Sequence, residues 1–107
     1  MNREPIGCVK AATHILGDKW TPRLLRFFAN EQSVRFGTLQ DFVKGINPRT
    51  LSARLQNLEH EGIIKKCTRD NSTRCEYQLT QKGSDLIPIL AAMEQWGKTY
   101  EPHCSDA

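Results

Sequence analysis

The segment from residue 47 to residue 62 (NPRTLSARLQNLEHEG) constrains the fold more than any other part of the sequence. Leu51, Leu55 and Leu58 recur at helical spacing and form one apolar stripe. The opposite face of the same helix carries polar or small residues, namely Arg49, Ser52, Ala53, Gln56 and His60. One face is thus expected to join a core, and the other to meet something polar.

The ends of this helix are marked by residues that suit helix termini. Asn47 can cap the first turn, and Pro48 suits the first helical position because its φ is fixed and it has no N–H to satisfy. Gly62 suits the left-handed position after a helix. The helix is therefore predicted to begin after Asn47 and to end before Gly62.

The elements on both sides of this helix indicate the fold class. Residues 37–43 are predicted to form a helix, and Lys44-Gly45 would turn the chain tightly into the helix that starts at Pro48. After Gly62 the pattern becomes extended, with strands at 63–69 and 74–79 around the turn formers of 70–73. The predicted fold is mainly α with a small β-hairpin, a winged helix-turn-helix.

The remaining elements flank this unit. Helices are predicted at 9–16 and 22–30, with a minor strand at 33–36. A last helix follows Thr80 and is interrupted near its start by Pro88. Its apolar stripe comprises Leu86, Ile89, Leu90, Met93, Trp96 and Tyr100. Because so small a core cannot easily cover this stripe, a homodimer interface is expected there.

Length and composition limit the alternatives. The chain has 107 residues, enough for one domain over 1–107. It has no run of 18 apolar residues and no apolar stretch near its N-terminus, so a cytoplasmic protein with no membrane contact is expected. The cysteines lack close C-x-x-C pairing, so no metal and no cofactor is predicted. A zinc site formed by Cys8, His103 and Cys104 would require distant segments to converge.

Charge is concentrated in the middle of the chain. The net charge is +3, yet residues 35–75 contain eight basic and four acidic residues. This asymmetry indicates a polyanion partner, although a solvated protein face gives the same signal.

Double-stranded DNA is the polyanion that fits the predicted fold. A helix enters the major groove with its N-terminal turns near the bases, where Arg suits guanine, Gln suits adenine and Ala leaves room for a thymine methyl. The predicted base readers are Arg49, Ser52, Ala53 and Gln56. Phosphate contacts are predicted for Thr50 and Arg54 beside them. Contacts with flanking phosphates or with the minor groove are predicted for residues before the helix-turn-helix and in the hairpin, namely Arg35, Lys65, Arg69, Asn71, Ser72, Thr73 and Arg74. Alternatively, Arg54 pairs with Glu59 or Glu61, and the hairpin is an ordinary solvated turn.

Five motifs in order carry a family resemblance. They are 17-GDKWT-21, 35-RFGTLQ-40, 46-INPRTLSARLQNLEHEGII-64, 76-EYQLTQKG-83 and 93-MEQWG-97. Over residues 8–97, leaving a polar tail at 98–107, the chain resembles the HxlR-type transcription regulators, a winged-helix branch close to the MarR group. The resemblance implies a homodimer joined through its N- and C-terminal helices, which adds Val9 and Ala12 to the interface. It also implies an inverted repeat with half-sites about one helical turn, roughly 10 bp, apart, and places Trp20 and Trp96 in the framework.

The resemblance further implies a sensing cysteine near the N-terminus. Cys8 is the matching residue, and a helix start with Lys10 nearby would stabilise its thiolate. Two departures count against the transfer: Val9 follows Cys8 where the family typically has Pro, and Cys8 lies closer to Trp20 than usual. Cys104 is the candidate disulfide partner across the dimer, and a purely structural thiol is the alternative. Cys67 and Cys75 are expected to be inert.

The function expected from these features is sequence-specific transcription regulation, with repression as the expected outcome. No Gly-rich phosphate loop, H-E-x-x-H motif or nucleophile with its base is present, so an enzyme is not expected. Two alternatives stay open. The signal is a small molecule held at the dimer interface rather than an oxidant, or the fold is a winged-helix module that binds a protein and never DNA.

Overall fold

The computed structural model describes residues 9–68 and 75–103. The helices are α1 (Lys10–Leu16), α2 (Thr21–Phe28), α3 (Phe36–Phe42), α4 (Pro48–His60), α5 (Gln81–Ser84) and α6 (Ile87–Tyr100). The strands are β1 (Val34–Arg35), β2 (Ile64–Thr68) and β3 (Cys75–Leu79). The predicted candidates Cys8, Arg69, Asn71, Ser72, Thr73, Arg74 and Cys104 lie outside the described residues.

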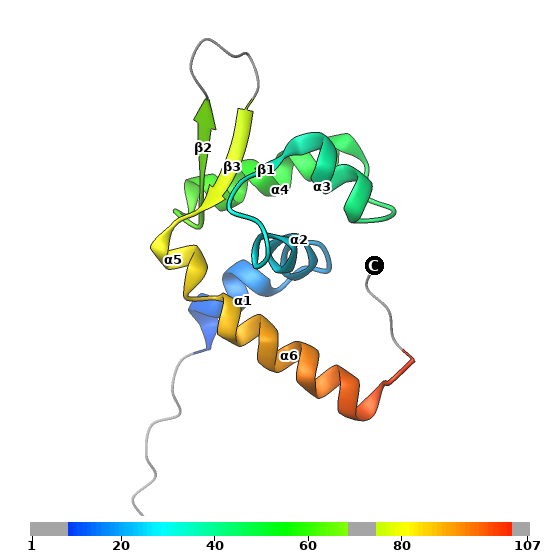
Figure 1. Cartoon of the computed structure of the whole chain (residues 1–107). Helices are drawn as coiled ribbons and strands as arrows, with labels where there is room; N and C mark the ends of the chain where they lie inside the picture. Colours follow the sequence, from blue (N-terminus) through cyan, green and yellow to red (C-terminus); the bar gives the residue numbers. More distant parts are fainter. Residues whose placement is uncertain (1–8, 69–74, 104–107) are drawn as a thin grey trace, which may run out of the picture.

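Helix α2 lies at the centre of the fold (Figure 1). Helices α3 and α4 lie on one side of it, together with the strands, and α6 crosses the other side. The core between them is aliphatic with two aromatic side chains. Its buried members are Ile15, Leu24, Leu25, Phe28, Val34, Leu39, Val43, Ile46, Leu51, Leu55, Leu58, Ile63, Ile64, Tyr77 and Leu90.

Helix α4 has the ends that the sequence predicts. Oδ1 of Asn47 accepts a hydrogen bond from the N–H of Thr50 at 2.8 Å. At the other end Gly62 has a φ of +77°, and the N–H of Ile63 reaches back to the carbonyl of Leu58 at 2.9 Å. These two features are those of a Schellman ending, in which only glycine adopts the left-handed position without strain. Both predicted ends of the helix are confirmed.

The turn between α3 and α4 is short and contains a glycine with a positive φ. Gly45 has a φ of +88°, which a side chain would disfavour, and Ile46 directly after it is 6% exposed. The glycine reverses the chain and the isoleucine anchors the turn in the core. The predicted helix-turn-helix is therefore confirmed.

The predicted hairpin is present, and it belongs to a three-stranded antiparallel sheet in the order β1-β3-β2. The minor strand expected at 33–36 is β1, which pairs Val34 with Tyr77 and Arg35 with Glu76. A two-residue strand is too short to show an alternating pattern, so the sequence alone did not reveal this pairing. The strand attaches the start of α3 to the hairpin.

The predicted break near Pro88 separates α5 from α6. Oγ1 of Thr80 caps α5 by accepting a hydrogen bond from the N–H of Gly83 at 3.1 Å. Pro88 lies in the first turn of α6, where a missing N–H costs nothing. The last element is thus a short helix followed by a long one, as the proline indicates.

Candidate nucleic-acid interface

The polar face of α4 is open to solvent. Leu51, Leu55 and Leu58 are 0 to 1% exposed, so the helix is fixed with that stripe inward. Arg49, Ala53 and Gln56 consequently face outward and are exposed, while Ser52 and Thr50 are half-buried at the edges. The structure therefore groups the three exposed predicted base readers on one face, with Ser52 beside them.

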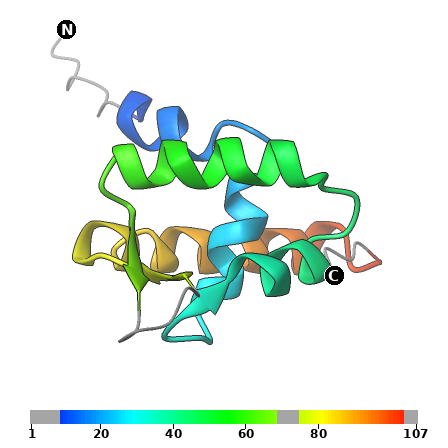
Figure 2. The ribbon, with the colours of Figure 1, turned by 90° about the horizontal axis from the view of Figure 1, so that it is seen from above.

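Helix α4 is held from one side by α1 and by the segment that joins α1 to α2. His14 Nε2 and Glu61 Oε2 are 2.9 Å apart, and Nη1 of Arg54 lies 3.6 Å from Oδ2 of Asp18. The hydrogen bond from His14 keeps the pKa of Glu61 below its ordinary value. Figure 2 shows α1 on this side of α4, and α3 and the strands on the other. Arg54 thus pairs with Asp18. The alternative that the sequence suggested, a pair with Glu59 or Glu61, is wrong.

Asp18 makes most of the polar contacts in the segment between α1 and α2. Its Oδ1 accepts hydrogen bonds from the N–H groups of Trp20 and Thr21, each at 2.8 Å. Its Oδ2 accepts a hydrogen bond from the Thr21 hydroxyl at 2.6 Å. Partial burial raises the pKa of Asp18, but these hydrogen bonds and the Arg54 charge outweigh it, and the pKa is lowered. Asp18 thus caps the start of α2.

The sheet lies on the other side of α4. Ile64 and Tyr77 are buried, and the register pairs Lys66 with Tyr77 and Lys65 with Gln78. Because side chains alternate between faces along a strand, Lys66 shares the face of Ile64 and Tyr77, while Lys65 lies on the opposite face. Both lysines are exposed. Lys66 is thus a cation on the α4 side of the sheet that the sequence interpretation missed, since the pleat could not be assigned without the register.

Tyr77 shows that this sheet face and the end of α4 lie close together. Burial raises the pKa of Tyr77, Lys66 acts in the opposite direction, and Cys75 and Glu59 of α4 raise it further. Helix α4 packs against β2, and the charge of Glu59 acts on Tyr77 from this side, whereas Arg54 and Glu61 lie on the α1 side. The exposed face of α4 lies between the two.

Arg35 lies where the sheet meets the helix-turn-helix. It is exposed, it pairs in register with Glu76, and it directly precedes the first residue of α3. The residues predicted at the hairpin tip fall in 69–74, outside the described part of the chain.

The predicted dimer residues divide into two groups. Val9, Ile89, Met93, Trp96 and Tyr100 are 42 to 73% exposed. Ala12 and Leu86 are half-buried. Leu90 corrects the prediction, because at 4% exposure it belongs to the core of its own chain.

Two faces of α6 explain this division. The face with Leu90 and Glu94 is turned to α2, where Glu94 pairs with Arg26, and Lys98 Nζ lies 3.3 Å from Glu94 Oε1. The other face leaves Met93 and Trp96 uncovered. No helix in the described part of the chain combines the length and apolar character needed to cross a membrane.

The two described cysteines are free thiols, and both are half-buried. Cys67 is opposite Glu76 in the register and Cys75 is opposite Thr68, which puts the two thiols on different faces of the sheet. They are therefore not arranged for a disulfide with each other. Among residues 9–68 and 75–103, no three His, Cys, Asp or Glu side chains gather closely enough to hold a metal ion.

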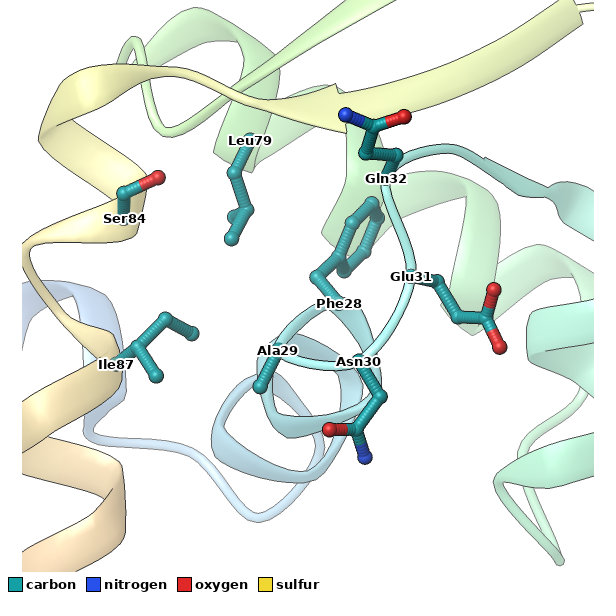
Figure 3. Close-up of a pocket in the computed structure, with 8 residues that line it drawn as sticks. All are labelled: Phe28, Ala29, Asn30, Glu31, Gln32, Leu79, Ser84 and Ile87. Carbon is teal, nitrogen blue, oxygen red and sulfur yellow. The ribbon is translucent and has the colours of Figure 1, made fainter.

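A cavity of about 360 Å³ lies away from α4. It is lined by Phe28, Ala29, Asn30, Glu31, Gln32, Leu79, Ser84 and Ile87 (Figure 3). Leu79 and Ile87 point into the hollow, and the Glu31 carboxylate points away from it. The cavity lies within one chain and not on the exposed stripe of α6, where the sequence interpretation placed an alternative ligand site.

Comparison with known proteins identifies the family. Residues 15–105 match the model of the HxlR-like helix-turn-helix proteins. The chain belongs to the HxlR-like family. As a family member it is a transcription regulator with a helix-turn-helix DNA-binding domain.

The relatives of this HxlR-like chain are regulators in bacteria and archaea. A helix-turn-helix transcriptional regulator of Methanothermobacter thermautotrophicus is 34% identical over 96 residues, covering 89% of this chain and 72% of the relative. The regulator YvaP of Bacillus subtilis is 36% identical over 86 residues, covering 79% of each chain.

Solved structures agree with the winged-helix fold of this HxlR-like protein. PA1607, a candidate transcription factor, superposes with a TM-score of 0.82 at 31% identity, covering 97% of this chain and 73% of PA1607. The redox regulator HypR in its oxidized form superposes with a TM-score of 0.77 at 28% identity, covering 87% of this chain and 96% of HypR.

Replacing Asp18 with Asn should destabilise the fold in a pH-dependent way. A carboxylate whose folded pKa is lowered adds stability above its ordinary pKa of 3.8, and this stability is lost as the pH falls through the folded value. We expect a loss of about 1 kcal/mol at neutral pH, typical for a helix cap, and a gap to the wild type that shrinks on acidification. Urea unfolding followed by circular dichroism from neutral to acidic pH measures this gap.

The matched control is Asp41→Asn, which changes an exposed carboxylate in α3. It should follow the wild type at every pH. A gap for Asp18→Asn that stays constant from neutral to acidic pH would contradict a role for the charge.

Proposed function

We propose that this chain binds an inverted-repeat operator as a homodimer, represses transcription from it, and loses affinity when Cys8 is oxidised. The observation that supports DNA binding is the exposed polar face of α4, which lies between α1 on one side and the sheet on the other. Membership in the HxlR-like helix-turn-helix family supports the same part.

The chemistry of this face suits base edges. An α-helix fits the major groove of B-DNA, and the groove presents a different donor and acceptor pattern for each base pair. Arg49 offers two donors for guanine, Gln56 offers a donor and an acceptor for adenine, and Ala53 between them leaves space for a thymine methyl. A module that only docks proteins has no need for this set on one helix face.

A second copy of the chain is the proposed cover for the outer face of α6. Ile89, Met93, Trp96 and Tyr100 lie three or four residues apart and form one continuous stripe. Monomeric soluble proteins rarely expose such a stripe, and symmetric dimers bury the same patch of both subunits. Two-fold symmetry would place two α4 helices on DNA and so requires an inverted repeat.

Repression and thiol control rest on simpler arguments. A small dimer bound over a promoter excludes polymerase by occupying its site. HypR, which has the same fold at 28% identity, is a redox regulator. Cys8 is two positions before Lys10, the first residue of α1, so a thiolate there would be near a cation and a helix start.

The first experiment is selection of bound duplexes from a random pool, followed by titration of variants. We expect the wild type to select an inverted repeat with half-site centres about 10 bp apart. Gln56→Ala should lose about 1–3 kcal/mol on the selected duplex and become tolerant at one base position. Fluorescence anisotropy with single-base variants of the duplex measures both effects.

Gln95→Ala is the control for this titration, since it removes the same side chain from an exposed position of α6. It should bind every duplex like the wild type. Failure of the wild type to enrich any motif would instead favour the protein-interaction module.

Replacing Met93 with Glu should separate the dimer without unfolding the chain. Met93 is 49% exposed, so a carboxylate there is solvated in the monomer but buried unpaired in the dimer. Sedimentation velocity should show a dimer for the wild type and a monomer for Met93→Glu, with the same circular dichroism spectrum. Gln95→Glu adds the same charge beside the stripe and should remain dimeric. If both variants have the mass of the wild type, α6 is not the interface.

A promoter reporter tests repression and thiol control together. The reporter should be low with the wild-type chain and rise after diamide. It should be high in a deletion strain, and it should stay low after diamide with Cys8→Ser. A low reporter in the deletion strain contradicts repression. A normal diamide response in Cys8→Ser contradicts the sensor role and leaves a small molecule as the signal.

A further inference from the structure

Two cations meet at one indole ring in the segment that joins α1 to α2. Nζ of Lys19 lies 4.7 Å from the ring centroid of Trp20, and Cζ of Arg23 lies 5.4 Å from it. Both distances are within the range in which an aromatic face attracts a cation. Lys19 is exposed, whereas Trp20 and Arg23 are half-buried. The ring therefore holds a long, flexible lysine in place while its charge stays in solvent.

The ring also fixes where these charges lie relative to the helix-turn-helix. A Cβ built on Gly45 would lie 3.8 Å from Cη2 of Trp20, so the indole is beside the turn between α3 and α4. Asp18, the residue before Lys19, faces Arg54 of α4. The two cations are thus anchored near the N-terminal half of α4, where the base readers lie.

The helical period of α4 shows on which side of its exposed face each neighbouring element lies. On a helix of 3.6 residues per turn, Arg54 and Glu61 lie about 100° to one side of the exposed face of α4, and Glu59 lies about 100° to the other. The first side contacts α1 and the segment that joins α1 to α2, and the second faces the sheet, because α4 packs against β2. Figure 2 shows the same order, with α4 running between α1 and the strands. The exposed face is therefore flanked by Lys19 on one side and by β2 and β3 on the other.

DNA has the complementary arrangement. A helix about 10–12 Å wide nearly fills the major groove, which is about 12 Å across, so a phosphate strand passes along each side of it. The β2–β3 hairpin, through Lys66, would meet the phosphate backbone of one DNA strand. We propose that Lys19, assisted by Arg23, binds a backbone phosphate of the other strand. The proposal rests on the DNA binding proposed above and adds a contact that the sequence motifs did not suggest.

The ligand is a phosphate rather than a base edge. The ammonium group of lysine is a compact charge that suits a phosphate oxygen, and a phosphate contact carries no sequence information. Because Trp20 already restricts the lysine, less side-chain entropy is lost when the contact forms. The contact would set the orientation of α4 in the groove without changing which bases are read.

Salt dependence is the measurement that separates this role from a structural one. The selected duplex is titrated at increasing KCl with the wild type, Lys19→Ala, Lys19→Arg and the control Lys98→Ala. Lys98 is an exposed lysine of α6 that pairs with Glu94. Helix α6 lies on the opposite side of α2 from α4 (Figure 1). Lys19→Ala should weaken binding by about tenfold, the factor for one charge-assisted hydrogen bond. It should also reduce the log–log salt slope by about 0.9 for each phosphate that the variant no longer neutralises.

The other variants fix the interpretation. Lys19→Arg should keep the wild-type slope because the charge remains, and Lys98→Ala should bind like the wild type. The base preferences of Lys19→Ala should be unchanged, and so should its thermal unfolding. A wild-type slope for Lys19→Ala overturns the proposal even if affinity falls, since the weaker binding would then have a structural cause. Absence of wild-type binding to any duplex would overturn the DNA-reading function itself, a different result.

Discussion

The rest of the structure depends on the burial of one leucine stripe of α4. Each fully buried leucine contributes about 1.5–3 kcal/mol relative to an exposed one, and Leu51, Leu55 and Leu58 are all at most 1% exposed. This packing fixes the rotation of the helix about its axis. Since the helical period leaves no freedom once that rotation is fixed, Arg49 and Gln56 must face solvent. The reading face is thus a consequence of the core.

The leucine stripe fixes the rotation of α4 about its axis, but polar contacts are also needed to fix its position on the domain. Asp18 caps α2 with one carboxylate and also faces Arg54, so the start of one helix and the middle of another share an anchor. Trp20 next to it lies beside the turn at Gly45. A single short segment therefore positions α2, the turn and α4, which explains why the GDKWT stretch contains an acid, a cation and an aromatic ring in succession.

The sequence predicted the features that depend on neighbours along the chain. The stripe of α4, its Asn47 cap, the Gly62 ending and the break at Pro88 all follow from local spacing, and the structure confirms each. Contacts between distant segments were not predictable in this way. The partner of Arg54 is Asp18 of another segment, although acids on its own helix offered plausible spacing. Leu90 and Met93 share one apolar pattern, and only the position of α2 decides that the first is buried and the second is not. Likewise, Lys65 and Lys66 could be assigned to faces only when the register was known.

Helix α2 connects the proposed dimer interface with the reading face. Its Arg26 pairs with Glu94 on the inner side of α6, and its first turn is capped by the same Asp18 that faces Arg54 of α4. In the proposed dimer, a movement of α6 against the second copy would act on α2, and through α2 on the rotation and position of α4. In an inverted-repeat complex the distance between two α4 helices must match the spacing of the half-sites. An event at the proposed interface, such as oxidation at the N-terminus, need shift this distance only slightly to misalign both helices, which is how a thiol remote from the base readers would release DNA.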